Sequence, residues 1–138
     1  MRLILDPNVF VSAAVADGVS RRLVVLWRED RRYDLVVCPM LLDELDEVLR
    51  RDRFRTWITL DEVDALIRLL RSEASLLPDP HEVPLVSRDP DDDYLVALAR
   101  REKADAIVSG DHDLTALELD DLPILTPAHA VARLSETG

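Results

Sequence analysis

The chain has 138 residues, of which 48% are hydrophobic and 33% are charged, and its formal net charge is −11. This composition excludes a disordered chain, because there is enough apolar surface to build a core, and the length predicts one domain over residues 1–138. No apolar run is long enough to span a bilayer, and the single cysteine, Cys38, excludes an internal disulfide, so we expect a cytoplasmic protein without a membrane partner.

Short continuous apolar runs alternate with helical patterns along the chain. Such runs are typical of strands buried on both faces of a parallel sheet. In chain order the pattern predicts a strand at 3–5, helices at 8–16 and 20–31, a strand at 35–38, helices at 40–51 and 60–76, a short edge strand at 85–86, a helix at 91–102, a strand at 106–109, a helix at 111–117, a strand at 123–125 and a terminal helix after Thr126. This alternation predicts an α/β fold with a parallel β-sheet flanked by helices on both faces.

In a sheet of this kind the functional site lies beyond the carboxyl ends of the strands. That rule selects Asp6 and the segments 39–44 and 110–113. Asp6 also has a simpler role, because an aspartate between a strand and a helix can cap the helix. Ser109, at the end of its strand, could donate a hydrogen bond to a phosphate or to a metal-bound water.

Three consecutive aspartates open the predicted helix at 91–102. On a helical wheel the apolar face lies within about 60° of Asp92, whereas Asp91 and Asp93 point to either side. We therefore expect Asp92 to be the one acid of this run that faces inward. Glu44 likewise borders the apolar stripe of its own helix, whose other acids are expected to project outward.

Asp6, Glu44, Asp92 and Asp111 are thus expected to converge at one end of the sheet. Clustered carboxylates repel each other unless a cation lies among them, and sites made only of oxygen ligands favour Mg²⁺ or Mn²⁺. One or two such ions can activate water and stabilise the leaving oxygen when a phosphodiester is cleaved. The residue pattern therefore indicates phosphodiester chemistry at a carboxylate site.

The charge distribution does not decide whether the chain binds nucleic acid. A net charge of −11 repels a polyanion at long range, yet arginines cluster at 21–22 and at 50–55. Arginine pairs two phosphate oxygens at once, although solvated helix ends explain these clusters equally well. Trp27, Phe54 and Trp57 are expected in the core or at an interface rather than as platforms for base stacking.

Four motifs, in order over nearly the whole chain, resemble the PIN-domain family and most closely its VapC-type toxin branch. They are Leu-Ile-Leu-Asp-Pro-Asn-Val at 3–9, Leu-Leu-Asp-Glu-Leu at 41–45, Arg-Asp-Pro-Asp-Asp-Asp-Tyr-Leu-Val-Ala-Leu-Ala at 88–99 and Ile-Val-Ser-Gly-Asp-His-Asp-Leu at 107–114. Each motif is weak alone, and the ordered set is specific.

The resemblance implies a single PIN-like domain and a Mg²⁺- or Mn²⁺-dependent endoribonuclease. It further implies the toxin of a bacterial toxin–antitoxin pair, usually a homodimer, which acts on RNA and is silenced by a small antitoxin protein. The catalytic and metal-binding acids of the family match Asp6, Glu44, Asp92 and Asp111, with Asp113 as a further metal ligand. Asn8 and Ser109 match positions that support these acids or contact substrate. Pro7 departs from the family, which usually has Thr or Ser there, and removes a hydroxyl that could support Asp6.

Two other functions stay open. An acid-rich α/β phosphatase would need a nucleophilic aspartate with a second aspartate two residues later, but the chain has Asn8 two residues after Asp6. A catalytically degenerate PIN-like module, kept for binding protein, would explain Pro7 but not the presence of all four acids.

Overall fold

The strands form one five-stranded sheet in the order β3-β2-β1-β4-β5 in the computed structural model, which describes residues 1–81, 93–117 and 119–136. Every pair of neighbouring strands is parallel, as the sequence predicts. The strands are β1 (Arg2–Leu5), β2 (Asp34–Val37), β3 (Ser75–Leu76), β4 (Ala106–Val108) and β5 (Ile124–Leu125).

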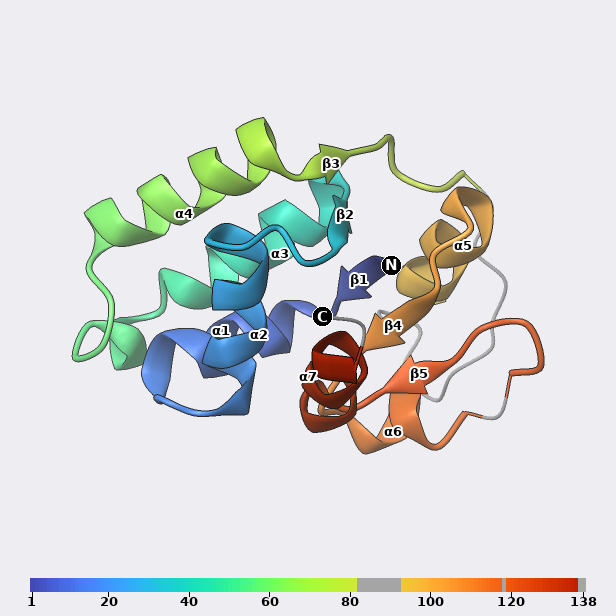
Figure 1. The fold of residues 1–138 in the computed structure, drawn as a ribbon. Helices are drawn as coiled ribbons and strands as arrows, with labels where there is room; N and C mark the ends of the chain where they lie inside the picture. Colours follow the sequence, from blue (N-terminus) through green and yellow to red (C-terminus); the bar gives the residue numbers. More distant parts are fainter. Residues whose placement is uncertain (82–92, 118, 137–138) are drawn as a thin grey trace.

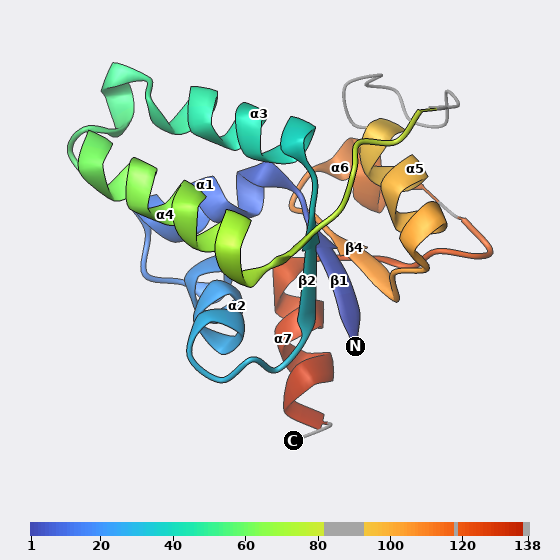
Figure 2. The same ribbon diagram turned by 90° about the horizontal axis from the view of Figure 1, so that it is seen from above.

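Helices cover both faces of the sheet, which confirms the expected α/β architecture. Figures 1 and 2 show α1 to α4 on one side of β1 and β2, and α5 and α6 on the other. No helix in the described ranges is long and apolar enough to cross a membrane. The helices are α1 (Pro7–Val15), α2 (Val19–Arg28), α3 (Pro39–Leu49), α4 (Leu60–Glu73), α5 (Asp93–Glu102), α6 (His112–Thr115) and α7 (Pro127–Glu136), with a 3₁₀ turn η1 (Asp52–Phe54) between α3 and α4.

Helix starts follow from local capping. The Asp6 carboxylate accepts a hydrogen bond from the backbone N–H of Asn8 at 3.0 Å, so α1 begins directly after β1. Thr59 forms a reciprocal capping box with Glu62 at the start of α4. The Thr126 hydroxyl accepts from the His129 N–H at 3.2 Å at the start of α7. These three predicted starts are confirmed.

The predicted end of the fourth helix, at residue 76, is wrong. The helix α4 ends at Glu73, and Ser75–Leu76 instead form the short strand β3 beside β2. The backbone N–H of Leu77 continues this pairing by donating to the carbonyl of Val37 at 2.9 Å. Pairing with an available sheet edge therefore decides the conformation of this segment. The expected strand at 85–86 and the first two residues of the expected helix at 91–102 lie outside the described residues.

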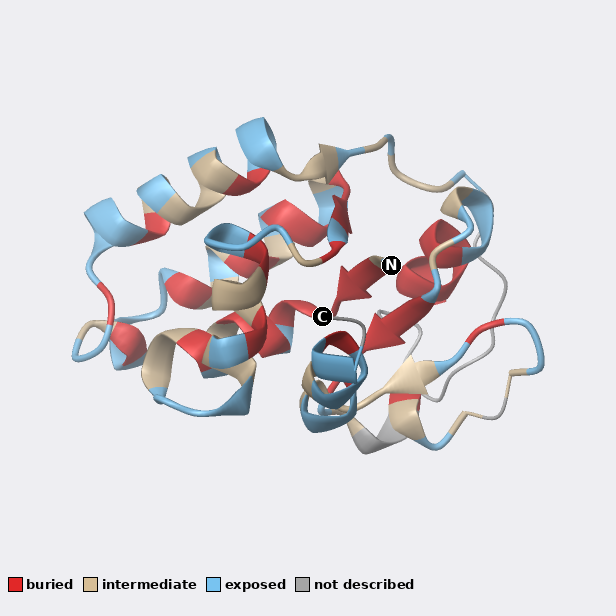
Figure 3. Ribbon diagram, viewed as in Figure 1, coloured by how far each residue is buried: buried red, intermediate tan, exposed pale blue. Residues whose placement is uncertain are grey.

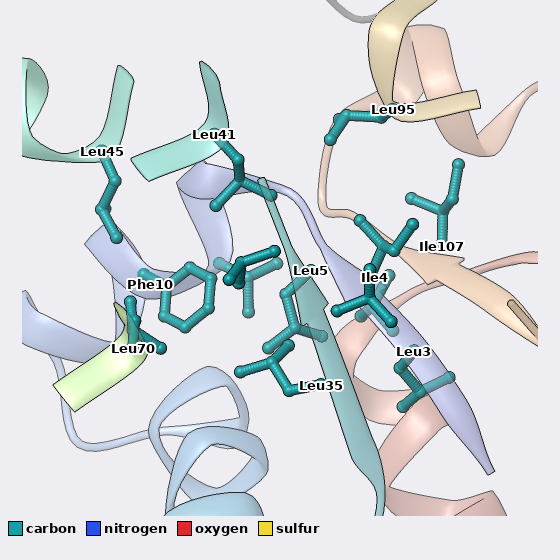
Figure 4. Close-up of a cluster of buried hydrophobic side chains, with 14 of the residues drawn as sticks. Leu3, Ile4, Leu5, Phe10, Leu35, Leu41, Leu45, Leu70, Leu95 and Ile107 are labelled. Carbon is teal, nitrogen blue, oxygen red and sulfur yellow. The ribbon is translucent and has the colours of Figure 1, made fainter. Parts of the chain in front are cut away.

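The core lies on both sides of the central strand β1. Leu3, Ile4 and Leu5 are fully buried, as expected for a continuous apolar run, and Figure 4 shows them between Phe10 and Leu35 on one side and Ile107 and Leu95 on the other. Figure 3 shows β1 and β4 as buried strands inside, the edge strand β5 as intermediate, and exposed outer faces on α4 and α7. This buried strand holds Asp6, the residue that follows it, in a fixed position at the carboxyl end of the sheet.

Candidate active site

The strand order changes direction between β1 and β4. The chain runs outward from β1 to β2 and β3, and then returns to β4 on the opposite side of β1. In parallel α/β sheets, the loops that leave two such strands diverge, and the crevice between them is the usual place for a ligand. Leu5 and Val108 are register partners in this pair, so the next residues, Asp6 and Ser109, begin the two diverging loops.

Asp6 is a buried carboxylate held by two donors. The residue is only 1% exposed to solvent. One carboxylate oxygen accepts from the Asn8 N–H at 3.0 Å, and the other accepts from the Ser109 hydroxyl at 2.8 Å. Its own N–H donates to the carbonyl of Val108 at 2.9 Å. Because each oxygen faces a donor, part of the free energy that burial of the charge costs is recovered.

Ser109 connects Asp6 to Asp111. Its hydroxyl donates to Asp6 and accepts from the Asp111 N–H at 2.9 Å, while the residue itself is fully buried. The carbonyl of Asp111 in turn accepts from the N–H and the hydroxyl of Thr115, at 2.9 and 3.1 Å, which fixes the start of α6. The single proton of Ser109 is directed at Asp6, so this hydroxyl orients the two acids rather than donating to a phosphate.

A pocket of about 270 Å³ opens beside these residues. Asn8 and Asp111 line it together with Ser12 and Ser20, the latter in the first turn of α2. Asn8 is exposed and Asp111 is half-buried, so both can be reached from solvent. Asn8 is therefore accessible at the rim of the pocket, and its expected contact with substrate stays a prediction.

Glu44 lies in the second turn of α3, the helix that packs against α1. It is half-buried, whereas Asp43 and Glu47 are exposed, so two of the three acids expected to project outward do so. Asp46, expected to point outward, is also half-buried, and it forms an ion pair with Arg50 at 3.0 Å.

The helical-wheel prediction for the aspartate run is wrong at Asp93. This residue was expected to point to the side of the helix, but it is fully buried at the first residue of α5. The wheel fails because residues 94–99 are all buried, so the first turns of α5 have no solvent face. A continuous apolar run after the acids is the sequence signal for this, since a helix that is apolar on all sides is buried on all sides.

The structure describes only some of the predicted metal ligands. Asp92 lies outside the described residues, and the Asp113 side chain does too. Among the side chains that the structure does describe, no group of three or more His, Cys, Asp or Glu residues could hold a metal ion. The acids at the carboxyl end of the sheet offer only oxygen donors, the ligand type that hard divalent cations prefer.

Comparison with known proteins identifies the fold. A family model described as PIN domain matches residues 2–113. The chain is similar in structure to VapBC2 from Rickettsia felis, solved bound to a DNA fragment from their promoter, with a TM-score of 0.58 and 13% identity over 91% of this chain and 98% of that one. It is similar to PAE2754 from Pyrobaculum aerophilum, with a TM-score of 0.60 and 14% identity over 98% and 95%.

A third similar structure is FitAcB from Neisseria gonorrhoeae, with a TM-score of 0.50 and 15% identity over 92% of this chain and 99% of that one. A comparison with curated protein sequences finds no match. At these identities the structural neighbours show the fold, and the family match covers most of the chain.

Proposed function

The chain belongs to the PIN-domain family, and on this premise we propose that it is a divalent-metal-dependent endoribonuclease. The observation that carries this proposal is the hydrogen-bonded connection from Asp6 through Ser109 to Asp111. It joins two acids at the carboxyl ends of β1 and β4, where the strand order reverses and a ligand crevice is expected.

Each residue of the site has a distinct role in this proposal. Asp6 and Asp111 hold the metal, and Ser109 fixes their relative orientation through its two hydrogen bonds. A bound Mg²⁺ or Mn²⁺ supplies an activated water and stabilises the charge on the leaving oxygen of RNA. Asn8, exposed at the rim of the pocket, contacts the substrate.

The remaining proposed metal ligands come from other elements. Because Asp93 is a fully buried carboxylate at the start of α5, we add it to the acids that the sequence indicates. Besides Asp6 and Asp111, the proposed metal ligands are therefore Glu44, Asp92, Asp93 and Asp113.

The biological role that we propose is that of the toxin in a bacterial toxin–antitoxin pair, working as a homodimer in the cytoplasm. Support comes from the four motifs in the sequence and from the likeness of the fold to VapBC2 and FitAcB. An acidic protein with a carboxylate site attracts a basic segment, so the antitoxin would enter the site with arginine or lysine. Co-purification with a small protein encoded next to this one, accompanied by loss of cleavage, tests the pairing.

The activity is tested on end-labelled single-stranded and stem-loop RNAs, incubated with Mn²⁺, with Mg²⁺ and with EDTA. We expect cleavage with either metal and none with EDTA. Asp6→Asn should abolish cleavage, because it replaces a charged, proposed metal ligand by a neutral amide. Asp43→Asn is the matched control, since Asp43 is exposed on α3 beside Glu44 and should leave cleavage unchanged.

Two results would contradict the proposal. Intact RNA together with hydrolysis of a phosphomonoester would identify a phosphatase. Intact RNA, no phosphatase activity and a tightly bound protein partner would identify a PIN-like module without catalysis.

A further inference from the structure

The turn between α3 and α4 carries the most exposed large apolar side chain in the described part of the chain. Trp57 is 54% exposed and Leu60, three residues later, is 46% exposed. Phe54 and Ile58, on the other side of the same turn, are buried at 8% and 9%. Trp57 was expected in the core or at an interface, and the structure excludes the core. The indole is available to a ligand.

This turn is held in one conformation. The Arg55 guanidinium donates to the carbonyls of Leu49, Arg51 and Ile58, which closes the turn from inside. The backbone N–H of Trp57 donates to the carbonyl of Phe54 at 3.0 Å. The capping box then fixes the start of α4. Because the turn is ordered in advance, a ligand that binds Trp57 meets little further cost in conformational entropy.

Several arginines lie close to Trp57 in the sequence, although the protein as a whole is acidic. Residues 50–55 contain four arginines and one aspartate, although the net charge of the chain is −11. Arg50 is engaged by Asp46 and Asp64. Arg51 and Arg53 are exposed, and neither forms a salt bridge with any described residue. The Arg53 guanidinium lies over the Phe54 ring, 4.8 Å from its centroid, and being exposed it can still contact a phosphate, as can that of Arg51.

We propose that Trp57, Arg51 and Arg53 form a platform for single-stranded RNA, on which a base stacks against the indole and the two arginines contact phosphates. This inference rests on the proposed nuclease function and adds a second contact for its substrate.

Figure 2 shows the turn at the end of α3 and α4 away from the strands. Helix α3 starts at Pro39, directly after β2, and ends at Leu49, where the turn follows, so its length of about 16 Å, or about five stacked nucleotides, leads from the carboxyl end of the sheet to the platform. One RNA strand can therefore reach both the platform and the site.

The charges favour RNA over a second copy of the chain at this surface. A two-fold interface centred on Trp57 would bring Arg51 and Arg53 of both copies close to the axis, and like charges gathered in one interface oppose association. A single-stranded polyanion instead pairs with both guanidinium groups, and a flat indole accepts any base.

Tryptophan fluorescence gives a direct test of the contact. The chain has two tryptophans, and Trp27 is only 2% exposed. An oligouridine of about 20 nucleotides, longer than the platform needs, is titrated into the protein in EDTA so that RNA stays intact. We expect saturable quenching in the wild type. Trp57→Phe should still bind the oligonucleotide, measured by anisotropy of a fluorescein label, but should lose the quenching.

Affinity gives the second test. Loss of one stacked base in Trp57→Ala should weaken binding about tenfold, while Trp57→Phe stays near the wild type. Replacing Arg51 and Arg53 by Gln together should reduce the slope of log affinity against log salt by about 1.4, or 0.7 for each phosphate contact. Leu76→Ala is the control, because Leu76 is 40% exposed on β3 and should change neither quantity.

The outcomes separate this inference from the proposed nuclease function. Cleavage of RNA by the wild type without quenching, or equal affinities for Trp57→Ala and Leu76→Ala, would overturn the platform. A shift of oligomeric state in Trp57→Ala with unchanged RNA affinity, measured by light scattering, would identify a protein interface and also overturn it. Quenching that depends on Trp57 in a protein that cleaves no RNA would support the platform and refute the nuclease.

Discussion

The hydroxyl of Ser109 donates a hydrogen bond to the carboxylate of Asp6 at 2.8 Å, although the two residues are 103 positions apart in the sequence. The same hydroxyl accepts from the N–H of Asp111 at 2.9 Å. One small side chain therefore links the carboxylate of Asp6, after β1, to the backbone of Asp111, after β4. The parallel pairing of β1 with β4 makes this contact possible, since it places Asp6 and Ser109 at the same edge of the sheet.

Ser109→Ala should weaken both the fold and the proposed site. The change removes a donor to a buried carboxylate and the acceptor for the Asp111 N–H, so we expect a loss of about 1–3 kcal/mol in the free energy of unfolding. Cleavage of RNA should fall by about 10-fold or more, as for other residues that orient metal ligands. Urea denaturation and initial cleavage rates measure the two effects.

The matched control for this change is Ser109→Thr, which keeps the hydroxyl and adds one methyl group. It should retain more cleavage activity than Ser109→Ala even if packing of the extra methyl lowers stability. Full activity in Ser109→Ala would show that the connection between Asp6 and Asp111 has no functional role.

The aspartate run offers a second prediction. Asp92→Asn should remove most cleavage activity, as the sequence indicates, and the complete burial of Asp93 now leads us to expect the same of Asp93→Asn. Loss of a metal ligand should lower activity by more than the about 10- to 100-fold typical of residues that only support a ligand, whereas Asp91→Asn should stay near the wild type. If Asp93→Asn retained full activity and only lost stability, Asp93 would be a structural residue of α5.

Local patterns predicted most of the fold. The starts at Asp6, Thr59 and Thr126 are visible in the sequence because capping is a local interaction. The carboxyl-end rule selected Asp6 and the segment after β4 for the same reason, since it needs only the strand ends. Those parts of the site were therefore predictable without a structure.

The parts that failed depend on contacts between distant segments. Ser75–Leu76 form a strand only because β2 offers an edge, which no local pattern reveals. Asp93 is buried together with residues 94–99, so the first turns of α5 have no exposed face, and a wheel with one apolar face could not rank the acids. The hydrogen bonds of Ser109 likewise require the register between β1 and β4.

Stability should decline at alkaline pH because of a buried thiol. Burial, followed by the neighbouring carboxylate of Asp79, raises the pKa of Cys38 from 9.0 to about 12. In the unfolded chain the thiol ionises near pH 9, so the free energy of unfolding should fall as pH rises from about 9 towards 12, by about 1 kcal/mol at pH 10. Burial also raises the pKa of Tyr33, which extends the loss above pH 10.

Cys38→Ala isolates this effect. The variant is destabilised at pH 7 by the missing side chain, but its stability should change less between pH 8 and pH 10 than that of the wild type. Parallel urea curves at the two pH values measure the difference. If the free energy of unfolding changed equally with pH in the two proteins, the Cys38 thiol would ionise as easily in the folded state as in the unfolded one.

Metal should stabilise the wild type and do less for a variant that lacks one acid. Clustered carboxylates repel one another when no cation is present, so Asp92→Asn should melt higher than the wild type in EDTA while its activity disappears. Mn²⁺ binds only the folded site, and at 100 times its dissociation constant it should stabilise the wild type by about 2.7 kcal/mol. In Asp92→Asn this gain should shrink, because a ligand is missing.

Asp43→Asn again provides the control, since it removes one exposed acid of the same charge from α3. Its melting temperature in EDTA and its gain from Mn²⁺ should match those of the wild type, which separates the effect of the site from that of net charge. Two melting curves for each protein, one in EDTA and one in Mn²⁺, are sufficient. If Asp92→Asn melted lower than the wild type in EDTA and gained as much from Mn²⁺, Asp92 would be a helix cap. The metal would then have to be bound by the other acids alone.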